Sequence, residues 1–170
     1  TDVIEIQEDL AIQIANALQT TMDPESLRDM VRVGTSNVDA YQAYIHGTGL
    51  WAASVLENNP PQMAEAYGYF EQAREIDPDF SYAHGAASLY WVTQLQLTSF
   101  QFDTSDAASF AEMQQFFYER NSSAVATARN AADAYHFHAT RAEIDLRFRE
   151  AIRLYREYLK VRPNDLDAWA

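Results

Sequence analysis

The sequence AYGYFEQAREIDPDFSYAHGAASLYW, residues 66–91, decides the fold class that we predict for this chain. Apolar residues recur at helical spacing on both sides of Pro78. Small Ala83 and Ala87 allow two helix backbones to approach closely, and the large Trp91 fills the remaining space. Because proline cannot continue the interior of a helix, Pro78 marks a corner between two antiparallel helices. Such a pair cannot bury its own apolar face, so further helices are expected to stack on it.

The composition favours a helical globular domain. A chain of 170 residues is long enough for one domain with a sizeable core. Aromatic residues make up 13% of it, whereas glycine and proline number five each, which argues against disorder and against a turn-rich β-fold. The absence of cysteine excludes disulfides and thiolate metal sites, and no apolar run is long enough to predict a membrane span. The chain begins at Thr1 and ends at Ala170, and we expect it to be a piece of a longer protein.

Charge is distributed unevenly along the chain. Residues 1–112 hold 17 acidic and three basic side chains, whereas residues 113–170 hold eight acidic and nine basic ones. The acidic part would repel a phosphate backbone, so no nucleic-acid partner is expected. Seven of the basic residues form a patch that can meet an acidic partner: Arg141, Arg147, Arg149, Arg153, Arg156, Lys160 and Arg162. The favoured interpretation is a solvated helix face paired with nearby acids, namely Glu143, Asp145, Glu150 and Glu157.

Capping residues and helix breakers place the remaining helices. Asp2 with Glu5 resembles a capping box, and Asp23-Pro24 is a cap followed by proline at the first helical position. Together with the Asn-Asn-Pro-Pro break at 58–61, these signals predict an all-α fold without strands. The expected helices are 2–22, 24–33, 38–56, 61–76, 80–98, 107–131 with a candidate break at 121–123, 132–148 and a partner ending at 161, with 99–106 as a loop and 166–170 as the start of another helix.

A helix-pair pattern repeats along the chain. Residues 1–37 read as N-terminal linker helices or the end of a preceding domain, followed by copies at 38–80, at 81–131 with an insertion, and at 132–165, and by the start of a further copy at 166–170. The residues that carry the pattern are Tyr41, Tyr44, Thr48, Ala66, Phe70, Ala73 and Pro78 in copy one, Ala83, Ala87, Ser88 and Trp91 in copy two, Tyr135, His138, Ala139, Ala142, Ala151, Tyr155 and Pro163 in copy three, and Trp169. This pattern resembles the tetratricopeptide (TPR) repeat of about 34 residues. The resemblance implies antiparallel helix pairs stacked as an irregular TPR-like superhelix, and an unrelated helical bundle is the alternative.

A second resemblance concerns the first third of the chain. TDVIEIQEDLAIQIANALQ at 1–19, a short helix, and NVDAYQAYIHGTGLW at 37–51 resemble a segment of bacterial multidomain proteins with C-terminal TPR arrays. In that group a TolB-like α/β domain usually precedes the repeats, and a class III nucleotide cyclase or a winged-helix domain lies further upstream. The resemblance implies a bacterial signalling or regulatory protein, on the cytoplasmic or the periplasmic side of a membrane. Residues 99–131 depart from the family pattern because they are longer and richer in Phe and Gln.

The sequence offers little that points to catalysis, so we expect this segment to be no enzyme and to hold neither a metal nor a cofactor. His136 and His138 are two positions apart on a predicted helix and therefore point to different faces. His138 is expected to point inward as a core imidazole. Asp77 and Asp79 flank Pro78, where aspartates serve as caps and turn formers, although a general acid/base pair is the other interpretation.

If the first helix of each repeat lines a groove, the repeat phase assigns the side chains that face it. In copy one these are Asp39, Gln42, His46, Gly49 and Leu50. In copies two and three they are Tyr82, Gly85, Leu89, Val92, Thr93, Asp133, His136, Thr140, Glu143 and Ile144. The residues expected to bind a partner are seven of these: Tyr82, Leu89, Val92, Thr93, His136, Thr140 and Glu143. An apolar middle with acidic and histidine edges suits an apolar or weakly basic peptide or helix. The alternative is that neighbouring helices, including the inserted one at 107–131, cover these residues.

Three functions are compatible with this pattern. The favoured one is a non-catalytic protein–protein interaction scaffold that docks a protein or peptide partner or mediates self-association. The second is a regulatory segment of a class III nucleotide cyclase. The third is a sensor of a small apolar ligand, built from Phe100, Phe102, Phe110, Phe116, Phe117 and Tyr118, which are more often core residues. The truncated copy at 166–170 also predicts a homodimer through the C-terminal edge.

Overall fold

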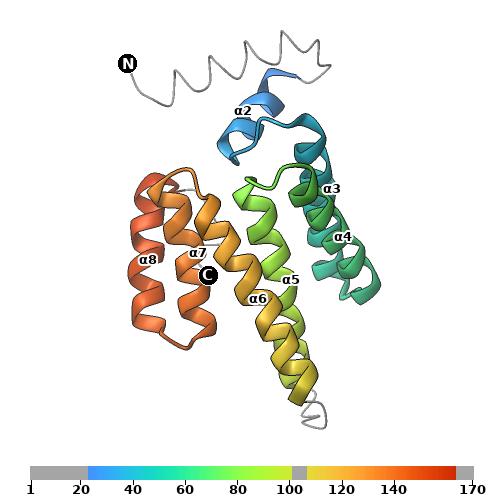
Figure 1. Ribbon diagram of the computed structural model, residues 1–170, viewed down its shortest axis with the longest axis vertical. Coiled ribbons are helices and arrows are strands. Elements are labelled where there is room, and N and C mark those ends of the chain that lie inside the picture. The colour runs from blue at the N-terminus through green and yellow to red at the C-terminus, as the bar shows by residue number, and fades with distance from the viewer. Residues whose placement is uncertain (1–22, 101–106, 164–170) are drawn as a thin grey trace.

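The computed structural model describes residues 23–100 and 107–163, and every regular element in these ranges is a helix (Figure 1). The helices are α2 (Pro24–Arg32), α3 (Val38–Glu57), α4 (Pro60–Ile76), α5 (Ser81–Phe100), α6 (Ala107–Thr127), α7 (Ala131–Ile144) and α8 (Phe148–Val161). The predicted all-α fold is therefore confirmed. None of the described helices is long and apolar enough to cross a membrane.

The helices pack in the order in which they occur in the chain. The main contacts form within three antiparallel hairpins, α3/α4, α5/α6 and α7/α8, and between consecutive hairpins through α4 with α5 and α6 with α7. Figure 1 shows the three hairpins side by side, with α3/α4 and α7/α8 on opposite sides of α5/α6. Each hairpin thus buries its apolar face against its neighbours, as expected for stacked helix pairs.

Asparagine and aspartate side chains start most of these helices where the sequence predicts. The Asp23 carboxylate accepts from the backbone N–H groups of Glu25 and Ser26 at the start of α2. The Asn37 side chain caps α3, and Asn59 caps α4 in front of Pro60. Asn58 takes a left-handed conformation with φ 50°, which ends α3 and turns the chain into α4. The predicted boundaries of α2 to α4 agree with the structure to within one residue.

The corner at Pro78 organises the first part of the core. Phe80 follows it, is fully buried, and has its ring centroid 5.1 Å from that of Tyr44 on α3. The Thr35 hydroxyl donates to the Asp77 carboxylate over 2.5 Å, which ties the α2–α3 loop to the corner. A second oxygen of Asp77 accepts from the backbone N–H of Asp79. Asp77 is therefore a turn former, as its position beside the proline indicates.

Two corrections concern helix ends in the second half of the chain. α6 is continuous through 121–123, where the sequence suggests a break, because Asn121 is fully buried and its Nδ2 donates to the Phe137 carbonyl oxygen over 2.9 Å. α7 ends at Ile144 rather than near Phe148, since Leu146 adopts φ 58° and turns the chain into α8. No glycine or proline marks that turn in the sequence, which explains the error.

Several sequence predictions lie outside the described residues. These are the first helix at 2–22, most of the loop at 99–106 and the further copy that begins at 166.

Helix α3 contains two glycines in opposite environments, which allows a test of the close packing between α3 and α4. A Cβ added at Gly47 would lie 2.7 Å from Cε1 of the Phe70 ring and 3.2 Å from the Ala66 carbonyl oxygen, whereas a Cβ at Gly49 would meet nothing within 4 Å. We expect Gly47→Ala to lower the free energy of unfolding by about 1–3 kcal/mol through overpacking. Gly49→Ala should raise it by up to about 1 kcal/mol through helix propensity. Urea unfolding measures both changes, and equal effects would contradict this helix crossing.

Candidate interaction surfaces

Helices α5 and α7, which carry the residues expected to line a groove, lie in parallel register. The Tyr82 hydroxyl donates to Oδ1 of Asp133 over 2.9 Å. One turn further along, a Cβ added at Gly85 would lie 2.5 Å from the Phe137 ring, so that ring packs directly on the α5 backbone. This register brings the following part of α5 to the same level as the second half of α7.

Tyr82 forms part of a buried polar network and does not line an open groove. Asp133 is 1% exposed, and besides Tyr82 it accepts from Nη2 of Arg162 over 2.9 Å and from Nδ2 of Asn130 over 2.8 Å. The Arg162 guanidinium also lies over the Tyr82 ring, 5.5 Å from its centroid. Burial and the charge of Asp133 raise the pKa of Tyr82 far above its ordinary value. The expectation that Tyr82 and Asp133 face a groove is therefore corrected.

The three remaining groove residues of α5 differ in exposure. Val92 is only 6% exposed and belongs to a core cluster with Leu95 and with Phe117 of α6. The inserted helix thus covers Val92, as the alternative interpretation holds, and Val92 is not available to a partner. Leu89 is 42% exposed, and Thr93 is half-buried with its hydroxyl donating to the Leu89 carbonyl oxygen. Leu89 and Thr93 remain candidates for contact with a partner.

On α7 the expected groove residues form a half-buried polar strip with Tyr155 of α8. The Thr140 Oγ1 lies 3.5 Å from the Tyr155 hydroxyl, which donates to the exposed Glu143 carboxylate over 3.2 Å. The His136 ring is half-buried, with its centroid 4.9 Å from that of Tyr158. Burial raises the pKa of Tyr155 to about 12, and the charge of Glu143 acts in the same direction. The strip can offer hydrogen bonds at its exposed edge, where Glu143 lies.

The groove residues expected in copy one lie in a separate place. Asp39, Gln42 and His46 line an open hollow of about 440 Å³ between α3 and α4, and the other hairpins contribute nothing to it. The His46 ring packs on that of Tyr69 with a centroid separation of 4.3 Å. Gly49 is exposed, and Leu50 packs against the core. The structure therefore brings three of these five residues together, away from the α5–α7 surface.

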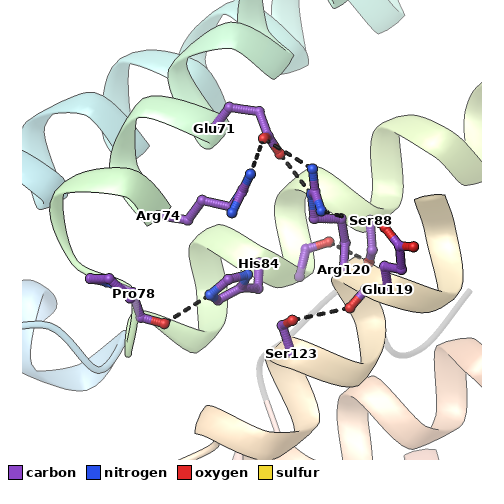
Figure 2. Close-up of polar contacts among 9 residues, drawn as sticks. Glu71, Arg74, Pro78, His84, Ser88, Glu119, Arg120 and Ser123 are labelled. Atoms are coloured by element: carbon purple, nitrogen blue, oxygen red, sulfur yellow. Dashed lines mark hydrogen bonds and ion pairs between the residues drawn. The ribbon is translucent and has the colours of Figure 1, made fainter.

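A half-buried ionic cluster joins the first two hairpins and was not found from the sequence (Figure 2). Glu71 of α4 accepts two hydrogen bonds from Arg120 of α6, at 2.9 Å and 3.2 Å, and one from Arg74. Burial alone would raise the pKa of Glu71, but the hydrogen bonds from both arginines outweigh it and lower that pKa below 4.5. The Glu71–Arg74 spacing of three residues is visible in the sequence, whereas Arg120 is far away along the chain.

His84 lies beside this cluster and is 6% exposed. Its Nε2 is 2.9 Å from the Pro78 carbonyl oxygen, as Figure 2 shows, which fixes the tautomer with the proton on Nε2. Burial lowers the pKa of His84 below 6.5, and the charges of Arg74 and Arg120 act in the same direction. A neutral imidazole bonded to the α4–α5 turn stabilises that turn.

The other histidine and aromatic predictions have mixed outcomes. His138 is exposed, so its expected place in the core is wrong. Phe117 is fully buried and the Phe116 ring stacks on Trp91 at 4.7 Å, so both belong to the packing of α5 against α6. Phe110 is 38% exposed, and the side chains of Phe100 and Phe102 lie outside the description. Across the described residues, no three histidine, aspartate or glutamate side chains gather closely enough to hold a metal ion.

The basic patch predicted from the sequence separates into two groups. Arg147 pairs with Asp145 and Glu150, and Lys160 pairs with Glu157, as the solvated-face interpretation expects. Arg162 pairs with Asp133, and the Arg141 guanidinium lies over the Tyr118 ring. In the part of the chain that the structure describes, no carboxylate lies within ion-pair distance of three exposed residues, Arg149, Arg153 and Arg156.

Comparisons of the chain with protein-family models, with curated proteins and with solved structures find no match.

The Glu71 cluster predicts a pH-dependent stability. Because the folded-state pKa of Glu71 lies below 4.5, its contribution is fully present above that pH and is lost as the pH falls through the folded value. We expect Glu71→Gln to lower the free energy of unfolding by about 1–3 kcal/mol at pH 7, with a smaller difference from the native chain at low pH. Urea unfolding at several pH values tests this. Glu75→Gln, at an exposed carboxylate on the same helix, is the control and should change little.

Proposed function

We propose that this chain is a TPR-like protein–protein interaction scaffold that binds a protein or peptide and performs no catalysis in this segment. The observation that carries the proposal is that most residues at matching repeat positions are buried in both the first and the third hairpin, with Tyr155, the half-buried counterpart of Phe70, as the exception. Ala66, Phe70 and Ala73 are buried at the interface of the first hairpin, and Ala151 and Tyr158 are buried in the third. A stack of similar hairpins exposes long continuous faces, which suits binding of extended or helical segments.

The surface that supports this function best lies on α5 and α7. Leu89 offers an exposed apolar side chain, and the parallel register places it at the level of Thr140 on the neighbouring helix. Thr93 on the next turn of α5, and Thr140 and Glu143 on α7, add polar groups and one negative charge to these two helices. An apolar or weakly basic peptide or helix fits this chemistry, since its apolar residue would cover Leu89 and its base would pair with Glu143.

The broader setting that we propose is a larger bacterial signalling or regulatory protein, in which this segment is the docking part. What supports it is the likeness of residues 1–51 to the segment that precedes TPR arrays in such proteins. No feature of the described residues favours the cyclase-regulating or ligand-sensing alternative. The aromatic side chains on which a sensor pocket would depend are largely taken up by packing, as Phe116 and Phe117 are.

Selection of binding peptides by display against the native chain, followed by variant analysis, tests the scaffold function. We expect Leu89→Asp to lower the affinity for the selected peptides by about tenfold or more, because it places a charge at the exposed apolar side chain of the surface. Leu56→Asp, at a side chain that is 88% exposed near the end of α3, should leave binding unchanged. Circular dichroism checks that both variants fold. Failure to select any peptide, or equal binding by both variants, would count against the proposal.

A further inference from the structure

The outer side of α8 presents an apolar surface that nothing in the described chain covers. Leu146 in the α7–α8 turn is 72% exposed, and Phe148 and Ile152 at the start of α8 are 55% and 51% exposed. Helix α8 packs mainly on α7 and lies at the edge of the stack in Figure 1. Large apolar side chains grouped in this way mark interaction surfaces more often than isolated ones do.

The backbone that displays Leu146 is strained. A branched residue at φ 58° is unfavourable in the left-handed region, where glycine would be accommodated without cost. Burial of the side chain does not compensate for this strain, because the side chain is exposed. Two backbone hydrogen bonds cap α7 here: the Leu146 N–H donates to the Glu143 carbonyl oxygen over 2.9 Å, and the Arg147 N–H donates to the Ala142 carbonyl oxygen over 2.7 Å. The Tyr118 hydroxyl, which donates to Asp145 over 2.5 Å, and Arg147, which pairs with the same carboxylate, add side-chain contacts to this cap. The cap therefore fixes an exposed leucine at the start of the apolar surface, at a position where glycine is the usual residue.

A row of positive charge runs beside the apolar surface. Three arginines, Arg149, Arg153 and Arg156, follow one another at helical spacing along α8. The first two each come directly after a residue of the apolar surface, and the third continues the same row. All three are exposed, and no described carboxylate pairs with them, although their neighbours Arg147 and Lys160 are paired. Three unpaired arginines on one face, in a chain of net charge −13, form a local exception to the overall charge.

We propose that Leu146, Phe148, Ile152, Arg149, Arg153 and Arg156 form a docking face for an acidic amphipathic helix of a partner protein. This inference rests on the proposed scaffold function. It adds a second binding surface to the scaffold and specifies the chemistry of the partner that binds there. The apolar side of the partner helix would cover Leu146, Phe148 and Ile152. Carboxylates along one edge of that helix, spaced three or four residues apart, would pair with the arginines, whose planar guanidinium groups bind carboxylates through two hydrogen bonds.

Charge also argues against the other occupants of this face. A phosphate backbone or an anionic lipid surface would meet the repulsion of a chain with net charge −13. Two copies of the chain joined face to face through α8 would bring six unpaired arginines together, which is unfavourable. A short acidic helix meets less of this repulsion than an extended polyanion, because its few carboxylates can all lie beside the three arginines while salt screens the more distant acidic residues.

Fluorescence anisotropy with a labelled synthetic helix tests the docking face. The probe carries leucines on one face and glutamates along one edge, and a version with glutamine in place of glutamate is its control. We expect the glutamate peptide to bind more tightly than the glutamine peptide, and its binding to weaken as salt is raised from about 0.05 M to about 0.5 M. The double variant Arg149→Glu/Arg153→Glu should weaken binding by about tenfold. Arg28→Glu, at an exposed arginine on α2, should leave it unchanged.

The Leu146→Gly variant separates this inference from a purely structural role of the turn. Glycine relieves the left-handed strain, so the variant should melt at a higher temperature and yet bind the glutamate peptide more weakly. Binding that is insensitive to the arginine reversals, no binding up to about 1 mM peptide, preferential binding to phosphatidylserine vesicles, or arginine-dependent dimerisation in sedimentation would each overturn the docking face. Peptides selected at Leu89 would still support the scaffold function in those cases.

Discussion

The buried carboxylate of Asp133 is the constraint on which the arrangement of the hairpins depends. A charge that is 1% exposed is costly unless hydrogen bonds and an opposite charge compensate for it. Its partners come from three places: Tyr82 on α5, Asn130 before α7, and Arg162 after α8. Arg162 also donates to the Arg32 carbonyl oxygen at the end of α2. Apolar stacking between hairpins tolerates sliding, whereas this network is satisfied in one register only, so it fixes how the stack is aligned.

How much of this fold the sequence predicts depends on where the determining contacts lie. Local signals such as Asn59-Pro60 and Asp77-Pro78 locate helix ends because the residues that stop the helix are adjacent in the chain. The turn at Leu146 escapes prediction because a leucine, where glycine is the usual residue, takes the left-handed position of the helix cap. The continuity of α6 escapes because its determining contact is distant, since the amide of Asn121 is satisfied by Phe137 in the next hairpin.

For the candidate surfaces, too, the sequence predicts the local features and the structure adds the distant contacts. Repeat phase identifies which side chains share a helix face, and the exposed Leu89 lies where the phase places it. The phase cannot show what covers a face: Val92 is covered by Phe117 of the inserted helix, and Tyr82 is bonded to Asp133. Likewise, the sequence contains the basic patch on the last helices, but only the structure distinguishes Arg147, which is paired, from Arg153, which pairs with no carboxylate among the described residues.

Opposite charges on the two surfaces give the stack two binding chemistries. The α5–α7 surface offers the exposed apolar side chain of Leu89 beside the half-buried polar strip of α7 and the carboxylate of Glu143. Burial of Leu89 would therefore carry most of its affinity, and salt would change that affinity little. The α8 face depends on Arg149, Arg153 and Arg156, so its affinity would fall with ionic strength. An acidic helix is repelled by Glu143 and attracted by the arginines, whereas a basic one meets the reverse. If both proposed surfaces bind, this charge pattern would select a different partner for each of them, and one stack of hairpins would hold two partners together.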